Sequence, residues 1–367
     1  MHYLDANATE PLRPEAREAM LAALAVTGNP SSIHRAGRDA RKLLEDARET
    51  IARRFGAGAA NVVFTSGGTE ADTLAVHALG AGRPTIVGAT EHDAIRAAAP
   101  DAAVLPVNAE GLVELAALEK LLKIGPLALV CVMLANNEVG TIQPIAAIAE
   151  ICRRFGALLH VDAVQAAGRM PIDLAALGAD SMAISSHKLG GSAGAGALLL
   201  NAEHSHIAPM IRGGGQERGR RGGTPPVAAI AGFAAAARLA ADAPHLAALR
   251  DSVEQAARAC GAIVCGGGAP RLSNTTCLAL PGVRADAQVI ALDLDGIAVS
   301  AGAACSSGKV AASHVLMAMG LGPLAAQAIR VSLPWNATPD AVAAFATSYK
   351  RMADRLRPAL VSAAALT

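Results

Sequence analysis

Short apolar runs alternate with longer alanine-rich stretches between about residues 50 and 240. The short runs are typical of buried strands, because they are brief, apolar and bounded by turn-forming residues. The longer stretches, such as residues 68–81 and 145–156, are typical of helices. The runs expected to be strands are residues 61–66, 83–90, 127–134, 157–164, 180–186 and 196–200. This alternation predicts an α/β fold with a mainly parallel sheet covered by helices on both faces.

The pattern changes after a long alanine-rich helix, which is expected over residues 226–243. Beyond about residue 250 the chain has strand-like runs of its own at residues 273–280, 297–302 and 328–333. We therefore expect two domains. The large domain comprises residues 15–249, and a smaller domain comprises residues 1–14 and 250–367.

Composition narrows the class of protein. Hydrophobic residues make up 52% of the chain but aromatic residues only 2%, so the core is expected to consist of Ala, Leu, Val and Ile. No apolar run approaches the roughly 18 residues of a spanning helix, and the N-terminus lacks the pattern of a secretory signal. The six cysteines are spread out without a CxxC pair, which favours a reducing cytoplasm and gives no indication of a metal site.

Charge gives no indication of a nucleic-acid partner. The net charge is +1, which argues against a broad electrostatic footprint for DNA or RNA. Residues 212–223, RGGGQERGRRGG, are basic and glycine-rich, but the stretch is short and has no interleaved aromatic residues.

Three of the expected strand ends carry unusual residues, and an open α/β sheet builds its site at that edge. The first is TSGGT before a helix, where glycines and free N–H groups suit a phosphate, although an ordinary helix cap is the alternative. The second is Asp162, which needs a cation or forms a structural salt bridge. The third is Lys188, a carbonyl nucleophile if desolvated and otherwise a surface lysine.

One cofactor accounts for all three strand ends. Pyridoxal 5′-phosphate needs a phosphate cradle, a lysine for its Schiff base, and an acid that keeps its pyridinium nitrogen protonated. Ten ordered motifs strengthen this interpretation: YLDANAT (3–9), GNPSSIHRAGR (28–38), FTSGGTEAD (64–72), TEHDAI (90–95), NNEVGTIQPI (136–145), HVDAVQ (160–165), SSHKLGG (185–191), RGGGQERGRRGGT (212–224), SAGAACSSGKVAASHVL (300–316) and IRVSL (329–333).

With these motifs the chain resembles the cysteine desulfurases of the NifS/IscS branch of the class V, fold-type I pyridoxal-phosphate enzymes. The resemblance implies a mainly parallel seven-stranded sheet in the large domain and a smaller C-terminal α/β domain. It implies that Lys188 carries the cofactor and that Asp162 pairs with the pyridine nitrogen. His92 is implied to stack on the ring and is a candidate for proton transfer.

The resemblance implies further contacts. Gly68, Thr69, Ser185 and His187 hold the phosphate, and Gln165 and Asn137 lie near the phenolic oxygen. Thr224 reaches the phosphate of the neighbouring subunit, which implies a homodimer. On the substrate side the resemblance places Asn7, Asn29, Asn137 and Arg330, the last of which grips the carboxylate. The plain alternatives are a surface pair of Glu91 and His92, turn or cap roles for Asn137 and Gln165, and a structural carboxylate beside Arg330.

Residues 301–309, AGAACSSGK, are the expected source of the nucleophile. Small residues on both sides of Cys305 predict a mobile loop, and the alternative is a small buried thiol. By resemblance, Cys305 takes the sulfur of L-cysteine as a persulfide, alanine leaves, and the sulfur passes to an acceptor such as an iron–sulfur scaffold or a tRNA-thiolation protein. Lys309, His314 or the following helix is expected to lower the pKa of this thiol.

Two other functions remain open at this point. A selenocysteine lyase or another class V enzyme would use the same cofactor residues. A sulfur carrier or regulatory module without turnover would keep the fold alone. Pro334, Pro225 and Pro226 depart from the usual family pattern and affect only the expected loop shapes.

Overall fold

The computed structural model describes residues 1–125, 127–240, 243–302 and 312–357. Within these ranges the main sheet has seven strands, and β8 alone runs in the direction opposite to the others. The predicted mainly parallel sheet is therefore confirmed. In spatial order the strands are β2 (Val62–Thr65), β8 (Gly196–Leu200), β7 (Ser181–Ser185), β6 (Leu158–Asp162), β5 (Leu129–Met133), β3 (Thr85–Gly88) and β4 (Ala103–Leu105).

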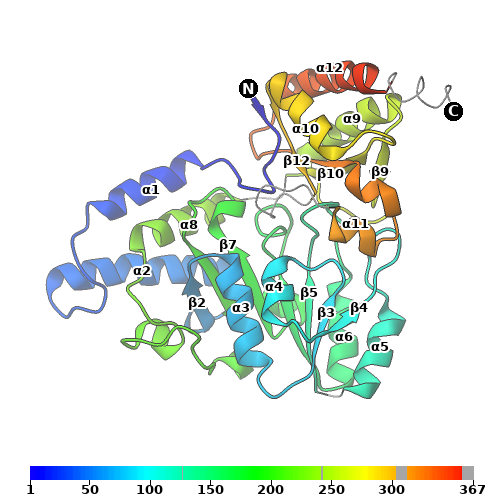
Figure 1. Cartoon of the computed structure of the whole chain (residues 1–367). Helices are drawn as coiled ribbons and strands as arrows, with labels where there is room; N and C mark the ends of the chain where they lie inside the picture. The colour runs from blue at the N-terminus through cyan, green and yellow to red at the C-terminus, as the bar shows by residue number, and fades with distance from the viewer. Residues whose placement is uncertain (126, 241–242, 303–311, 358–367) are drawn as a thin grey trace.

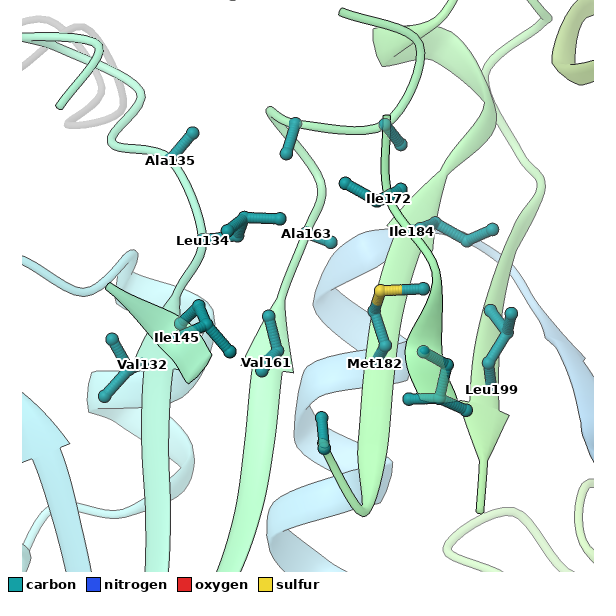
Figure 2. Close-up of a cluster of buried hydrophobic side chains, with 14 of the residues drawn as sticks. Val132, Leu134, Ala135, Ile145, Val161, Ala163, Ile172, Met182, Ile184 and Leu199 are labelled. Carbon is teal, nitrogen blue, oxygen red and sulfur yellow. The ribbon is translucent and has the colours of Figure 1, made fainter. Parts of the chain in front are cut away.

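Helices cover both faces of this sheet (Figure 1). Alternate residues of each strand point to opposite faces, so the two faces have separate apolar clusters. Val63, Ala183 and Leu198 pack with α3 (Gly68–Leu79). The other face meets α2 (Arg35–Arg54), α6 (Ile145–Arg154) and α8 (Val227–Leu239). Figure 2 shows this second cluster, which includes Val132, Val161, Met182, Ile184 and Leu199.

A second body of structure lies above the large sheet in Figure 1. Its antiparallel sheet has the order β12 (Ser300–Ala301), β13 (Ala328–Ser332), β10 (Thr275–Ala279) and β9 (Ile263–Cys265). The N-terminal β1 (His2–Tyr3) pairs with β11 (Ile297–Ala298), and Leu4 belongs to the apolar core of this body. Helices α9 (His245–Ala259), α10 (Ala285–Leu294) and α12 (Pro339–Leu356) complete it. We propose a division into residues 15–249 and residues 1–14 with 250–367.

The remaining elements are short or lie at the edges. They are α1 (Pro14–Leu24), α4 (Asp93–Ala98), α5 (Leu115–Ile124), α7 (Leu174–Leu177), α11 (His314–Ala318), η1 (Ala59–Asn61), η2 (Ser186–Lys188), η3 (Ala202–His204), η4 (Gln216–Gly219) and η5 (Gly322–Ala326). The run expected as one strand at residues 297–302 forms two strands, β11 and β12, in different sheets. Among the described residues no helix combines the length and the apolar character needed to cross a membrane.

Candidate active site

A cavity of about 220 Å³ opens at the carboxyl ends of the strands of the large sheet. Strands β5, β6 and β7 run parallel, so their last residues Met133, Asp162 and Ser185 lie at the same edge. Crevices at this edge are the usual binding sites of open α/β sheets. The residues that line the cavity are Gly68, Thr69, Asp72, His92, Met133, Asn137, Asp162, Val164, Gln165, Ser185, His187 and Lys188.

The N-terminus of α3 provides one wall of the cavity. Its N-cap is Gly67, which offers no side chain to the first N–H groups of the helix. A Cβ at Gly68 would lie 2.7 Å from Cγ2 of Val164, so only glycine fits at this position. The hydroxyl of Ser185 is buried and has no hydrogen-bond partner among the described residues. Free helix N–H groups beside such a hydroxyl suit an anion.

Asp162 forms the floor of the cavity and is 6% exposed. Its Oδ1 accepts a hydrogen bond of 2.8 Å from the backbone N–H of Val164. Burial raises the pKa of this carboxyl to about 7, and the nearby carboxyl of Asp72 adds to the rise. A buried carboxylate is stabilised by a positive partner, so the floor of the cavity favours a ligand with a cationic nitrogen.

Asp72, on α3, is a cavity residue that the sequence analysis missed. Its Oδ1 lies 3.1 Å from Nε2 of His160, and Nδ1 of His160 lies 2.8 Å from Oγ of Ser181. Burial raises the pKa of Asp72 to about 8 and lowers the pKa of His160 to about 4. Burial therefore favours the neutral forms of both groups near pH 7, so the contact is a hydrogen bond and not an ion pair.

This protonation state predicts a pH effect on stability that Asp72→Asn removes. Near pH 7 the folded chain holds a proton on Asp72, whereas an unfolded aspartate, with a pKa near 3.9, has released it. Stability is then lost as the pH rises through the folded-state pKa, by up to about 1.4 kcal/mol per pH unit. Urea unfolding without bound small molecules, at pH 7 and pH 9, is expected to show a larger loss for the wild type than for Asp72→Asn. If the wild type and Asp72→Asn lost the same free energy of unfolding between pH 7 and pH 9, Asp72 would not be the protonated group, because the other titrating groups are common to both proteins.

Lys188 follows β7 directly in the short helix η2. Its Nζ donates to the carbonyl of Asn7 at 2.5 Å and to the carbonyl of Ala8 at 2.9 Å. The amine thus lies at the wall of the cavity, between the large sheet and the N-terminal segment. The surface-lysine alternative is excluded by this placement.

His92 and Gln165 also line the cavity. His92 is the N-cap of α4, and its Nδ1 accepts from the N–H of Ala94 at 3.1 Å. Its neighbour Glu91 is only 1% exposed, so the two residues are not a surface pair. Nε2 of Gln165 donates to the carbonyl of Asn7 at 3.0 Å, and Oε1 accepts from Arg169 at 2.7 Å. These bonds fix the amide of Gln165 at the cavity wall.

His187 lines the cavity beside Lys188 and faces the N-terminal segment. Its Nδ1 lies 3.2 Å from Oγ1 of Thr9. Burial, together with the positive charges of Lys188 and Arg169, lowers the pKa of His187 to about 4. The ring is therefore neutral at pH 7 and acts as a hydrogen-bonding group rather than as a cation.

Arg330 and Asn7 lie beside the cavity and are linked to it through Asn137. The carbonyl of Asn137 accepts from Nη1 of Arg330 and from Nδ2 of Asn7, both at 3.1 Å. Nη2 of Arg330 donates to Asp5 at 2.6 Å, so the structural carboxylate considered for this arginine is present. Nε of Arg330 is buried and has no partner within the described ranges. The guanidinium therefore keeps a donor for a further acceptor.

Besides Asn7 and Arg330, which lie beside the cavity, two further expected site residues in the described ranges lie away from it. Asn29 lies on an exposed loop, where its Oδ1 accepts from the N–H of Ser31 at 2.9 Å. Thr224 lines a separate cavity together with Ser66 and Arg221. Cys305 lies outside the described residues, as does Lys309. These assignments stay predictions.

Two of the three candidates for lowering the pKa of Cys305 lie within the described residues, namely the following helix α11 and His314. His314 begins α11, and its Nε2 lies 3.0 Å from the carbonyl of Glu91. Burial and the positive charge of Arg96 lower the pKa of His314 itself, so its ring is neutral at pH 7.

Besides Asp72, the sequence analysis missed Met133 and Val164. Asp72 follows Gly68 by four residues on α3, which places both on one face of that helix. Val164 follows Asp162 by two residues at the end of β6. Two patterns in the sequence could have indicated these residues. One is the helical spacing between Gly68 and Asp72, and the other is the alternation of side chains that continues from Asp162 to Val164.

Comparisons with known proteins agree with this geometry. The model of the family "Aminotransferase class-V" matches residues 2–345. An IscS-like cysteine desulfurase of Mycobacterium tuberculosis is 40% identical over 359 residues, which cover 91% of each chain. A cysteine desulfurase of Cereibacter sphaeroides is 42% identical over 350 residues, which cover 90% of each chain.

Solved structures show the same likeness. A NifS-like protein from Rickettsia africae superposes with a TM-score of 0.90 at 36% identity, covering 96% of this chain and 99% of that one. SspA, solved in complex with cysteine, gives a TM-score of 0.80 at 29% identity, with 91% of this chain and 99% of that one covered. The chain therefore belongs to the class-V aminotransferase family, in its cysteine desulfurase branch, as the resemblance of its motifs implied.

Proposed function

We propose that this protein is a pyridoxal-phosphate-dependent cysteine desulfurase. It converts L-cysteine to L-alanine, and the thiol of Cys305 becomes a persulfide, so that the sulfur atom is the group transferred. The observation that carries the proposal is the cavity at the sheet edge, where the amine of Lys188, the carboxyl of Asp162 and the N-terminus of α3 meet.

The described residues fit this cofactor. The unpartnered hydroxyl of Ser185 and the uncapped start of α3 suit its phosphate, and the buried Asp162 suits its pyridinium nitrogen. We propose that Gly68, Thr69 and His187 complete the phosphate site and that His92, Asn137 and Gln165 surround the ring. Bound in this cavity, pyridoxal phosphate would supply an electron sink for Cα of the substrate, which would weaken the bond between Cβ and sulfur.

The chain's own groups supply the other functions. Lys188 holds the cofactor and takes the proton from Cα of the substrate. Arg330 binds the substrate carboxylate, for which its planar guanidinium is well suited. Cys305, as a thiolate, attacks the substrate sulfur and forms the S–S bond of the persulfide. The Cβ–S bond breaks, its electron pair stays on the carbon side, and Cβ gains the proton that completes alanine. Asn7 and Asn29 are proposed to line the substrate side.

Partners and location follow as proposals. We propose a homodimer in which Thr224 contributes to the neighbouring site, and a sulfur-acceptor protein such as an iron–sulfur scaffold or a tRNA-thiolation protein. The five cysteines that the structure describes are free thiols, as is usual in a reducing compartment. We therefore propose a cytoplasmic location.

Asp5 is expected to orient Arg330 for the substrate carboxylate. Its Oδ1 accepts from Arg330 at 2.6 Å, while its Oδ2 accepts from Oγ of Ser300 at 2.7 Å. Asp5→Asn is expected to raise KM for cysteine about tenfold with a smaller change in kcat, since a hydrogen bond to a charged group contributes about 1.5–3 kcal/mol. Asp286→Asn, which removes an exposed partner of Arg284, is the matched control and should leave KM unchanged. A fall in kcat alone would argue against this role.

The test of the proposed function compares the wild type with Cys305→Ser. The wild type, loaded with pyridoxal phosphate and given L-cysteine, is expected to form alanine and to gain the mass of one sulfur atom on Cys305. Cys305→Ser is expected to bind cysteine, as followed by cofactor absorbance, and to form neither persulfide nor significant alanine. Alanine formation at the wild-type rate in Cys305→Ser would show that Cys305 is not the nucleophile. A wild type that strongly prefers selenocysteine to cysteine as substrate would favour the selenocysteine lyase alternative.

A further inference from the structure

Glu138 is a buried carboxyl of the large domain that has no role in the mechanism so far. It follows Asn137 directly and is 2% exposed. Its Oε2 accepts a hydrogen bond of 2.5 Å from Oγ of Ser313, which is itself 1% exposed. Burial raises the pKa of Glu138 to about 7, although the hydrogen bond from Ser313 and the positive charge of Arg330 act in the opposite direction. Such a group is costly to bury, so a specific reason for its presence is expected.

The same carboxyl oxygen also approaches Gly302. A Cβ at this position would lie 2.4 Å from Oε2 of Glu138 and 3.2 Å from Cβ of Ser313. The glycine is thus required by close contact with the carboxyl. Gly302 and Ser313 lie on opposite sides of residues 303–311 in the chain, and one carboxyl of the other domain contacts both.

The backbone that carries Glu138 is held firmly. Oδ1 of Asn136 accepts from the N–H groups of Glu138 at 2.8 Å and Val139 at 3.0 Å. Nδ2 of Asn136 donates to the carbonyl of Thr90 at 3.1 Å. The carbonyl of Asn137, one residue before Glu138, is the acceptor of Arg330. One rigid turn therefore contacts both the proposed carboxylate site and the residues on either side of the Cys305 stretch.

We propose that Glu138 is a positioning residue for sulfur transfer, which holds Gly302 and Ser313 so that the chain between them presents Cys305 to the substrate. The inference rests on the proposed function, because it concerns the step in which Cys305 takes the sulfur. Glu138 is not required for cysteine to bind, since Arg330 and the cavity residues do that. Removing the Glu138 side chain is therefore expected to slow persulfide formation while cysteine binding stays nearly unchanged.

The test uses Glu138→Ala, Glu138→Gln and Ser313→Ala in the cofactor-loaded full chain. Cysteine binding is followed by cofactor absorbance, and persulfide on Cys305 is followed by mass spectrometry in a single turnover. Glu138→Ala and Ser313→Ala are expected to slow persulfide formation about tenfold to a hundredfold, because a displacement of about 1 Å has effects of this size. Cysteine binding is expected to change by less than about twofold, and Glu138→Gln, which keeps shape and an acceptor, to transfer sulfur at close to the wild-type rate.

Two matched controls separate positioning from general damage. Glu254→Ala removes another buried glutamate, paired with Arg271. Thr338→Ala removes the N-cap of α12, as Ser313→Ala removes the N-cap of α11. Both controls are expected to transfer sulfur normally.

Each outcome of this test has a distinct meaning. The proposal is overturned if Ser313→Ala behaves like Thr338→Ala, or if Glu138→Ala loses cysteine binding and sulfur transfer equally. If Glu138→Ala does not fold, the comparison of Ser313→Ala with Thr338→Ala decides alone. A wild type without alanine or persulfide would instead refute the proposed function itself.

Discussion

Lys188→Ala is expected to abolish alanine formation, with a loss of at least about 10⁴-fold in kcat. In the proposed function the amine at this position holds the cofactor covalently and also moves the proton at Cα, and a positioned acid–base group alone contributes about 10²–10⁴-fold. The variant is expected to retain pyridoxal phosphate by non-covalent contacts, because the start of α3 and Asp162 are unchanged. The measurements are alanine formation at saturating cysteine and the mass of the intact protein after borohydride reduction.

Two further variants make this result specific. Lys188→Arg keeps the positive charge but is a poor nucleophile and base, so it is expected to be as inactive as Lys188→Ala. Lys42→Ala is the matched control, because Lys42 is an exposed lysine on α2 that pairs with Asp46. A Lys188→Ala protein that kept more than about one hundredth of the wild-type activity would show that the proton moves through another group.

The sequence predicted the part of the site that depends on strand ends. Residues at the carboxyl ends of neighbouring parallel strands must meet at one edge, whatever the details of packing. Asp162, Ser185 and Lys188 end or follow such strands, Gly68 follows β2, which runs in the same direction, and the structure brings all four together in one cavity. The expected runs for β2, β3, β5, β6, β7 and β8 are all strands in the structure.

Other parts could not be predicted, because they depend on contacts between distant segments. Asp5 meets Arg330 across 325 positions, and no periodicity relates the two. Glu138 belongs to one of the sequence motifs, but its contacts with Gly302 and Ser313 join segments that lie far apart in the sequence. The run at residues 297–302 is uniformly strand-like, yet its halves pair with different partners, β1 and β13, and so enter different sheets.

Asp162→Asn is expected to weaken pyridoxal phosphate binding and to lower kcat for alanine formation by about 10²–10³-fold. The amide has nearly the same shape but no negative charge, and removing one preorganised electrostatic partner in an active site typically has an effect of this size. Burial already raises the pKa of this carboxyl to about 7, so a cationic nitrogen beside it favours the ionised form. Cofactor binding to the wild type is therefore expected to release a proton near pH 7, which the variant cannot release.

Titration calorimetry of cofactor binding in two buffers of different ionisation enthalpy measures this proton directly. Asp180→Asn is the matched control, because Asp180 contacts His204 and the N–H of Leu159 at the opposite edge of the sheet. It is expected to bind the cofactor with the wild-type proton release. Equal proton release by the wild type and Asp162→Asn would mean that another group titrates, and unchanged affinity in Asp162→Asn would mean that the carboxyl does not pair with the ring nitrogen.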